Sequence, residues 1–547
     1  MTGMSGGKAL VRSVLNQGVD TIFTIPGVQL DHFFNALHDE GNAVRVIQVR
    51  HEQAAAYMAF GYAQSTGRVG CFAVVPGPGL LNTTAALATA YGCNAPVLCL
   101  AGQVPTRHIG RGLGMLHEIP DQLAILRGLT KWAGRINHPS EVPAAVAEAF
   151  RQLQSGRPQP VGLEMPPDQM ARRAAVTALE AQAPPPPLEP DPELVKAAAK
   201  LLGEAQSPMI FAGSGAIGAE AELKQLAELL QAPVVTHRMG KGVLSDRHYL
   251  AQSTVAAKKI WPQVDVIVGV GSRLQGPRMQ WPERGPAAPR KIVHIDIDPT
   301  EIGRIGRADV SLVADARETL KALLPVLEKQ NRQRPSREEE LTALKAEVMA
   351  RFDAELGPQM GYSRALRAAL PDDGIMVDEL TQVGYMNRAA FPVYQPRTFI
   401  STGYQGTLGF GFATALGVKV AHPERPVLSI NGDGGFLYTM PELATAVQHG
   451  INVVAVVFND GAYGNVRRMQ KNEYGGRLIA TDLKNPDFVG LAQSFGALGL
   501  RAGSPDELKG AIETGFAHPG PVLIDAPVGE MPDPWQTLES TAIKQKN

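Results

Sequence analysis

Residues 427–464 read VLSINGDGGFLYTMPELATAVQHGINVVAVVFNDGAYG, and this stretch decides the fold of the chain. Two short apolar runs rich in β-branched residues, Val427–Ile430 and Val453–Phe458, each predict a buried strand. A strand, a connecting helix and a second strand form a unit whose strands are parallel and whose connection is right-handed. Because ligands of parallel sheets bind beyond the carboxyl ends of the strands, the residues that follow these two runs are candidates for a site.

The segment between the two runs predicts one helix with clear boundaries. Thr439 and Glu442 have the spacing of a capping box, in which two side chains satisfy backbone N–H groups at a helix start. Pro441 fits the first turn of that helix, and Gly450 ends it. We therefore expect a single helix that begins near Thr439.

Each predicted strand is followed by a cluster of polar residues and glycines, at 431–435 and 459–464. The glycines allow backbone amides to approach anionic oxygens. Asp433 and Asp460 supply the oxygen ligands that Mg²⁺ prefers, together with phosphate and water. This pattern predicts a site for a divalent cation and a phosphate ester. Two ordinary turns with solvated aspartates are the alternative that the residues alone leave open.

The pair of clusters resembles the signature of the thiamine diphosphate enzyme family, which reads Gly-Asp-Gly, a spacer and Asn-Asn. Here Gly-Asp-Gly is followed by Asn459 and then by Asp460, which puts one extra negative charge beside the diphosphate. The resemblance implies that Asp433, the Asp460 side chain and the Ala462 carbonyl bind Mg²⁺. It further implies that the cofactor is contacted by Gly432, Gly434, Gly435 and Tyr463.

A second element of the resemblance is Glu52, which lies within VRHEQAAAY at 49–57, at the start of a predicted helix. A glutamate in the first turn of a helix is common, because the helix dipole favours it, and this is the structural alternative. The sequence around Glu52 resembles the pyrimidine-binding domain of the thiamine enzymes. The resemblance implies that its carboxylate bonds N1′ of the cofactor, which makes the 4′-amino group basic enough to take the C2 proton.

A third element is the segment FISTGYQGTLGFG at 399–411, which resembles the part of the family that holds the cofactor in its bent shape. Leu408 matches the bulky residue wedged between the two cofactor rings, and the Gly406 carbonyl matches the acceptor for the 4′-amino group. A glycine-rich loop that leads into a packed helix is the alternative for this segment taken alone.

Alternating strand-like and helix-like runs predict an α/β protein with three doubly wound parallel-sheet domains. We place a pyrimidine-binding domain at 1–172, a central Rossmann-like domain at 193–330 and a diphosphate-binding domain at 360–547. A proline-rich linker at 173–192 and a charged linker at 331–359 separate them.

Composition excludes several other classes of protein. The 547 residues are 44% hydrophobic and 19% charged, with a net charge of −1, and no basic run interleaved with aromatic residues is present. We therefore expect no nucleic-acid partner and no membrane association, and a cytoplasmic location. Cys71, Cys93 and Cys99 are an odd number of cysteines in one predicted domain, which favours small buried side chains over disulfides or a metal site.

Within the family, several short segments are similar to the acetolactate synthase large subunit, among them PGPG at 76–79, AGQVPT at 101–106 and SGRP at 155–158. The substrate-facing positions differ. Leu-His-Glu at 116–118 stands where that enzyme has Phe-Gln-Glu, and Met469 stands where it has tryptophan. His117 is therefore a candidate for holding the substrate carboxylate or for relaying a proton. A surface or structural histidine is the alternative.

The resemblance implies an enzyme that needs thiamine diphosphate and Mg²⁺, decarboxylates a 2-oxo acid such as pyruvate and transfers the remaining enamine to a carbonyl acceptor, as acetolactate synthase does. The alternatives are a non-ligating 2-oxo acid decarboxylase and a 2-hydroxyacyl-CoA lyase. Outside the class, the chain could be a catalytically silent homologue that binds the cofactor or a Mg²⁺-dependent nucleotide binder, neither of which would need Glu52.

In the family, Glu52 of one subunit completes the site of another subunit, so a homodimer or a homotetramer is implied. FAD is possible, because the family contains both flavin-bound and flavin-free members. No specific motif supports it here, since the glycine pairs at 213–215 and 269–271 are weak signals.

Overall fold

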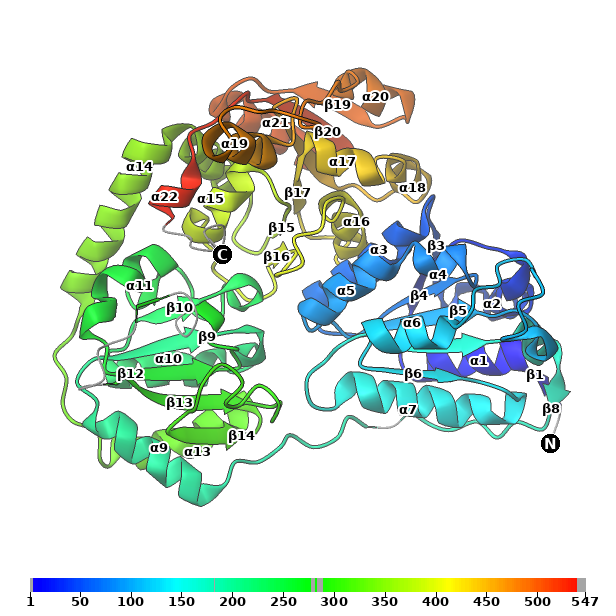
Figure 1. Cartoon of the computed structure of the whole chain (residues 1–547), viewed down its shortest axis with the longest axis horizontal. Coiled ribbons are helices and arrows are strands. Elements are labelled where there is room, and N and C mark those ends of the chain that lie inside the picture. Colours follow the sequence, from blue (N-terminus) through cyan, green and yellow to red (C-terminus); the bar gives the residue numbers. More distant parts are fainter. Residues whose placement is uncertain (1–2, 182, 277–280, 283–288, 539–547) are drawn as a thin grey trace.

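The computed structural model describes residues 3–181, 183–276, 281–282 and 289–538 of the chain (Figure 1). Three six-stranded sheets, parallel throughout, follow one another along the sequence, each with helices packed against it. This confirms the predicted fold class of three doubly wound α/β units. None of the helices in the described part of the chain has both the length and the hydrophobicity of a membrane span.

The N-terminal sheet has the strand order β3-β2-β4-β5-β7-β6, so the chain winds outward in both directions from the middle strands. Its strands are β2 (Thr21–Thr24), β3 (Arg45–Gln48), β4 (Gly70–Val74), β5 (Val97–Gly102), β6 (Trp132–Arg135) and β7 (Val161–Met165). Its helices are α1 (Gly6–Asn16), α2 (Asp31–Glu40), α3 (Glu52–Thr66), α4 (Pro78–Leu81), α5 (Thr84–Gly92), α6 (Gln122–Leu129), α7 (Val142–Gln154) and α8 (Pro167–Ala171). A short antiparallel pair, β1 (Met4–Ser5) and β8 (Arg173–Ala174), joins the two ends of this domain. All three cysteines are buried and free, as expected.

The central sheet has the order β11-β10-β9-β12-β13-β14. Its strands are β9 (Pro208–Ala212), β10 (Val234–Thr236), β11 (Ala251–Gln252), β12 (Val266–Val270), β13 (Lys291–Asp296) and β14 (Val310–Val313). Its helices include α9 (Pro192–Glu204), α10 (Glu220–Leu230), α11 (Thr254–Ile260) and α13 (Ala316–Glu328).

The C-terminal sheet has the order β16-β15-β17-β18-β20-β19. Its strands are β15 (Ile375–Asp378), β16 (Phe399–Ser401), β17 (Val427–Gly432), β18 (Val454–Asn459), β19 (Leu498–Arg501) and β20 (Val522–Pro527). Its helices are α14 (Glu338–Ala369), α15 (Gln382–Ala390), α16 (Gly411–Ala421), α17 (Asp433–Thr439), α18 (Glu442–Gln448), α19 (Gly464–Glu473), α20 (Phe488–Ser494), α21 (Pro505–Ala517) and α22 (Pro534–Thr537).

The two strands predicted from 427–464 are present and pair directly in parallel, with Gly432 opposite Phe458. The expected single helix between them is wrong, because the connection holds two short helices, α17 and α18. Pro441 has no N–H group to continue the first helix, and it becomes the N-cap of the second. No capping box forms, since the Glu442 carboxylate accepts hydrogen bonds from the backbone N–H groups of Arg50 and His51 instead.

Most of the segment 331–359, expected as a linker, is helical. It contains the first part of α14, which has a kink at Leu356. Three consecutive glutamates occupy its first turn, where the helix dipole favours negative charge. Leu341, Val348 and Phe352 are buried along it, so apolar packing holds the segment in place.

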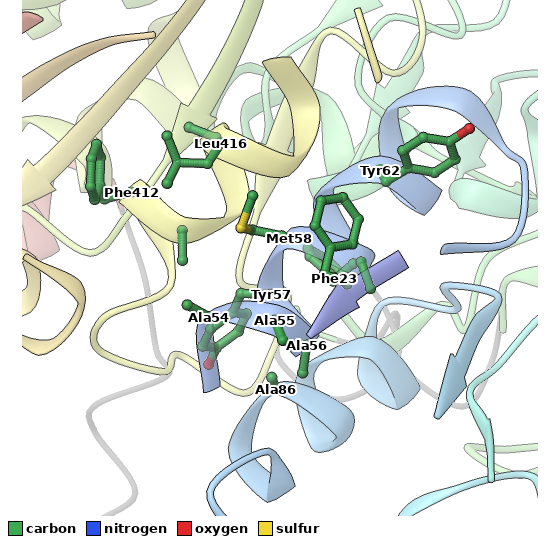
Figure 2. Close-up of a cluster of buried hydrophobic side chains, with 14 of the residues drawn as sticks. Phe23, Ala54, Ala55, Ala56, Tyr57, Met58, Tyr62, Ala86, Phe412 and Leu416 are labelled. Carbon is green, nitrogen blue, oxygen red and sulfur yellow. The ribbon is translucent and has the colours of Figure 1, made fainter. Parts of the chain in front are cut away.

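The N-terminal and C-terminal domains share one hydrophobic core, in which α3 lies against α16 (Figures 1 and 2). Figure 2 shows Met58 of α3 beside Leu416 of α16. The helices approach closely because both carry glycine at the contact. A Cβ atom on Gly61 would lie 2.2 Å from the Thr414 carbonyl oxygen, and one on Gly417 would lie 2.0 Å from that of Met58. This packing places the start of α3, where Glu52 lies, at the border of the two domains.

Candidate active site

The two aspartates predicted to bind a cation lie at the carboxyl ends of neighbouring strands. Asp433 directly follows β17, and Asp460 directly follows β18. The Asp433 carboxylate accepts hydrogen bonds from Gly461 N at 2.9 Å and from Asn485 Nδ2 at 2.6 Å. The Asp460 carboxylate accepts one from Ala462 N at 3.2 Å. The structure thus brings the two polar clusters to one edge of the sheet, and their binding of a cation stays a prediction.

Burial raises the pKa of both carboxyls. Burial is the main cause for Asp433. For Asp460, burial and then the charge of Asp433 raise the pKa to about 6. A divalent cation between the two carboxylates would remove this repulsion and replace lost hydration, so the residues fit a Mg²⁺ ion.

The rest of the coordination shell would come from other oxygens. Among the described residues, no group of three or more His, Cys, Asp or Glu side chains is arranged to hold a metal. A backbone carbonyl such as that of Ala462, phosphate oxygens and water would therefore complete a Mg²⁺ site, which is the mixture this ion commonly takes. The Oδ1 atom of Asn485 is another oxygen nearby, buried and without a hydrogen-bond partner.

Gln382 orients one of the proposed metal ligands, and nothing in the sequence singled it out. It is the first residue of α15 and is 6% exposed. Its Nε2 donates to Asp460 Oδ2 at 2.7 Å. Its Oε1 accepts from Arg468 Nη2 at 2.6 Å and from Met531 N at 3.2 Å. Both ends of the amide are therefore fixed, and the Asp460 carboxylate is held in one direction.

Replacing Gln382 by alanine should weaken Mg²⁺ binding roughly 10–100-fold, the usual effect of losing a hydrogen-bond partner of a metal ligand. The apparent Mg²⁺ dissociation constant, measured by titration at a fixed concentration of thiamine diphosphate, checks this. Gln470→Ala is a suitable control, because Gln470 lies in the same part of the fold and bonds only the backbone of Ile479 among the described contacts. Equal Mg²⁺ affinity in Gln382→Ala and wild type would contradict the assignment.

The turn after β17 packs closely against neighbouring side chains at two of its glycines. A Cβ atom on Gly434 would lie 2.6 Å from a ring carbon of Tyr463, and one on Gly435 would lie 2.2 Å from Oε1 of Glu379. Tyr463 is the N-cap of α19. Four expected cofactor contacts, Gly432, Gly434, Gly435 and Tyr463, therefore surround Asp433.

The segment 402–410, which we call the clamp loop, connects β16 to α16. It leaves β16 at the same edge of the sheet as the two aspartates. Gly406 and Gly409 have φ values of 61° and 76°, in the left-handed region that favours glycine. Leu408 is only partly buried, as a side chain that meets a ligand would be. Thr407 Oγ1 lies 3.1 Å from Thr89 Oγ1 of the N-terminal domain. The structure thus places the loop against both outer domains.

Glu52 begins α3, as predicted, and its carboxylate is partly exposed. It accepts a hydrogen bond from Asn82 Nδ2 at 3.0 Å, a contact that sequence reasoning missed. The preceding backbone is held from the other domain, because Arg50 N and His51 N both donate to Glu442. Among the described residues of this single chain, no hydrogen bond or ion pair joins Glu52 to the clamp loop or to Asp433.

His117 lies between β5 and α6 in the N-terminal domain, with an unusual φ of 67°. Its Nδ1 is 3.0 Å from Oε1 of Gln29, and the Gln29 amide also donates to the Leu116 carbonyl. A Cβ atom on Gly77 would lie 2.4 Å from the His117 carbonyl oxygen. The loop of His117 is therefore tied to the turn after β4, and its role with substrate stays a prediction.

A separate cavity of about 860 Å³ lies between the central domain and the two outer domains. Its lining includes the cations Arg238, Arg273 and Arg388. The glycine pairs noted in the sequence have another use here. A Cβ atom on Gly213 would lie 2.2 Å from the Gly271 carbonyl oxygen. Backbone packing between the ends of β9 and β12 therefore accounts for those glycines without a flavin.

Three family models match the chain, one within each of its three sheet domains. They are described as thiamine pyrophosphate enzyme N-terminal TPP binding domain, matching residues 4–125, central domain, matching 195–323, and C-terminal TPP binding domain, matching 381–526. The order is that expected from the sequence. Asp433 and Asp460 lie within the third match, and Glu52 lies within the first.

Curated relatives match over nearly the whole chain. A probable acetolactate synthase large subunit of Methanocaldococcus jannaschii is 36% identical over 559 residues, covering 98% of this chain and 93% of that protein. A probable 2-ketoarginine decarboxylase of Pseudomonas aeruginosa is 34% identical, covering 95% and 94%. The acetolactate synthase large subunit of Haemophilus influenzae is 32% identical, covering 94% and 93%.

Proposed function

Since the chain belongs to the thiamine pyrophosphate enzyme family, we propose that it is an enzyme dependent on thiamine diphosphate and Mg²⁺ that decarboxylates a 2-oxo acid and joins the remaining fragment to a carbonyl acceptor. The observation that carries the proposal is the pair of carboxylates, the buried Asp433 and the half-buried Asp460, at adjoining strand ends beside a glycine-lined turn. That pair suits a divalent cation that bridges to a diphosphate.

Each residue has one task in this proposal. Asp433, Asp460 and the Ala462 carbonyl hold Mg²⁺, and Gly432, Gly434, Gly435 and Tyr463 contact the diphosphate. Thiamine diphosphate supplies the stabilisation of carbanions that decarboxylation of a 2-oxo acid requires. Leu408 and the Gly406 carbonyl would hold the two rings of the cofactor. Glu52 holds a proton at N1′ of the pyrimidine ring.

Carbon–carbon bond formation is the favoured outcome, because the relatives include acetolactate synthase large subunits matched over nearly their full length. A decarboxylase that releases an aldehyde is the second candidate. The relative described as a probable 2-ketoarginine decarboxylase supports it, as do the departures at His117 and Met469 from the acetolactate synthase pattern. Both candidates use the same site. In the first a carbonyl acceptor reacts there after CO₂ has left, whereas in the second an aldehyde is released.

Release of CO₂ from a panel of 2-oxo acids tests the proposal. The panel contains pyruvate, 2-oxobutanoate and 5-guanidino-2-oxopentanoate, each with both cofactors and with either one omitted after chelation. We expect turnover of at least one acid that stops when thiamine diphosphate or Mg²⁺ is left out. Preference for the guanidino acid with no ligated product would favour the second candidate. Turnover without either cofactor would contradict the proposal.

We further propose a homodimer, or a homotetramer built from it, in which Glu52 of one subunit serves the Asp433 site of another. The absence of a contact between Glu52 and the clamp loop within the described chain supports this arrangement. Mixing Glu52→Gln and Asp433→Ala subunits, each inactive alone, should then recover roughly a quarter of wild-type activity, because half of the dimers are mixed and each has one intact site. No recovery after verified subunit exchange would place both residues in one chain's own site.

A further inference from the structure

Glu379 is a buried carboxylate that the proposed function does not use. It directly follows β15 and is fully buried. Its Oε1 accepts a hydrogen bond from Gly409 N at 2.7 Å, and its Oε2 accepts one from Gly411 N at 3.0 Å. Its own N–H donates to the Ile430 carbonyl at 3.2 Å, which fixes its backbone to the strand that leads to Asp433.

These two hydrogen bonds hold the end of the clamp loop. Phe410, between the two glycines, packs edge-on against Tyr57 and Phe60 of α3, with ring centroids 5.7 and 5.6 Å apart. A loop with glycines at positive φ has many alternative conformations, so it needs such anchors to keep one shape. Leu408 and Gly406 lie directly before this anchored point.

The same carboxylate also borders the turn that is proposed to take the diphosphate. A Cβ atom on Gly435 would lie 2.2 Å from Oε1 of Glu379, and one on Gly411 would lie 2.7 Å from Oε2. Glu379 therefore fills the space between the clamp loop and the Gly-Asp-Gly-Gly turn. A movement of this side chain would therefore displace both the clamp loop and the turn proposed to take the diphosphate.

Removing an ionised carboxylate from water costs free energy of folding, so a buried glutamate here indicates a specific use. Burial raises the pKa of Glu379 to about 7, against the lowering effect of the backbone N–H groups of Gly409 and Gly411. An ionised carboxylate accepts strongly at both oxygens, whereas a glutamine of the same shape has one acceptor and turns an NH₂ group toward the second N–H. The anchoring of the Gly409 and Gly411 amides is therefore strongest with the charged form.

We propose that Glu379 is a positioning residue for the cofactor, because it sets the backbone of the clamp loop so that Leu408 and the Gly406 carbonyl meet the thiamine rings in one geometry. The inference rests on the proposed function and deepens it. Glu379 does not touch the reacting atoms, and it acts through the loop.

The test compares Glu379→Gln with Asp378→Asn. Asp378 is the adjacent buried carboxylate, and it bonds Asn387 and Arg388 in place of the clamp loop. Hydrogen exchange of peptides that cover 402–411, measured without cofactor, reports the loop itself. Dissociation constants for thiamine diphosphate at saturating Mg²⁺, and the rate of C2 proton exchange of the bound cofactor in D₂O, report the consequence.

In Glu379→Gln we expect faster amide exchange at Gly409 and Gly411. We also expect the thiamine diphosphate dissociation constant to rise roughly 10–100-fold, as it does when a residue that orients a ligand-binding group is lost. At saturating cofactor, C2 exchange should still be slower by roughly tenfold or more, because misplacement by about 1 Å has effects of that order. Asp378→Asn should lower the thermal midpoint and leave both cofactor measurements at their wild-type values.

The inference would be overturned if Glu379→Gln showed the same rate of amide exchange in the clamp loop and the same cofactor affinity as the wild type. Glu379→Asp, which keeps the charge but is one methylene shorter, is the second variant if the glutamine protein fails to fold. We expect weakened cofactor binding in it, and wild-type affinity there would equally overturn the inference. Failure of the wild-type protein to bind thiamine diphosphate would instead contradict the proposed function, so the two failures are distinguishable.

Discussion

Turnover should fall roughly 10²–10⁴-fold when Glu52 is replaced by glutamine, the usual contribution of one acid–base group. Glutamine keeps the size of the side chain and a hydrogen bond to Asn82, but it cannot hold or release a proton at N1′ of the cofactor. Because Glu52 is partly exposed and has one side-chain contact among the described residues, we expect the variant to fold and to keep its thermal midpoint.

Single-turnover and steady-state rates with the best 2-oxo acid measure this effect. Glu220→Gln is a matched control, since Glu220 also lies in the first turn of a helix, α10 of the central domain, and accepts a hydrogen bond from the Gly218 backbone. The control should keep its full rate. Wild-type turnover in Glu52→Gln would remove Glu52 from the mechanism and leave its position at the helix start as a structural preference.

Binding of thiamine diphosphate that depends on Mg²⁺ should be lost in Asp433→Ala. This carboxylate is 2% exposed and is fixed by Gly461 N and Asn485 Nδ2, so no neighbouring side chain can take its place without a rearrangement. Loss of a residue that only hydrogen-bonds a metal ligand typically weakens binding by roughly 10–100-fold, and we expect the loss of affinity in Asp433→Ala to exceed this. Calorimetric titration of the cofactor with and without Mg²⁺ measures it.

Asp460→Asn is the informative companion to that variant. It restores the residue of the family signature, keeps one side-chain oxygen for the metal and removes the repulsion by Asp433 that, after burial, raises the pKa of Asp460 to about 6. We expect it to retain Mg²⁺-dependent cofactor binding. Unchanged cofactor affinity in Asp433→Ala, or loss in Asp460→Asn alone, would contradict the assignment of the metal site.

Local patterns in the sequence predicted the parts of this site that are local in the chain. The β-branched runs that became β17 and β18 determine their own conformation, and Asp433 and Asp460 directly follow them. The resemblance to a known family added Glu52 and the clamp loop, which no periodicity would connect to those aspartates.

Contacts between distant residues could not be predicted in this way. Gln382 bonds Asp460 from 78 positions away, and Glu379 bonds Gly409 from 30 positions away. Neither glutamine nor glutamate has a local pattern that reveals such a partner. The predicted capping box at Glu442 was wrong for a related reason. Its spacing from Thr439 fits a capping box, but its carboxylate bonds Arg50, 392 positions away. Tertiary contacts override local preference where domains meet.

Proton NMR of the purified protein with thiamine diphosphate, Mg²⁺ and pyruvate is the sharpest test of the proposed reaction, because it identifies the product and also follows the consumption of substrate. We expect acetolactate, or acetoin formed from it by loss of CO₂, and neither product when Mg²⁺ is removed. Acetaldehyde as the sole product would contradict the proposed joining of the decarboxylated fragment to a carbonyl acceptor, and pyruvate unchanged with both cofactors bound would contradict pyruvate as the 2-oxo acid.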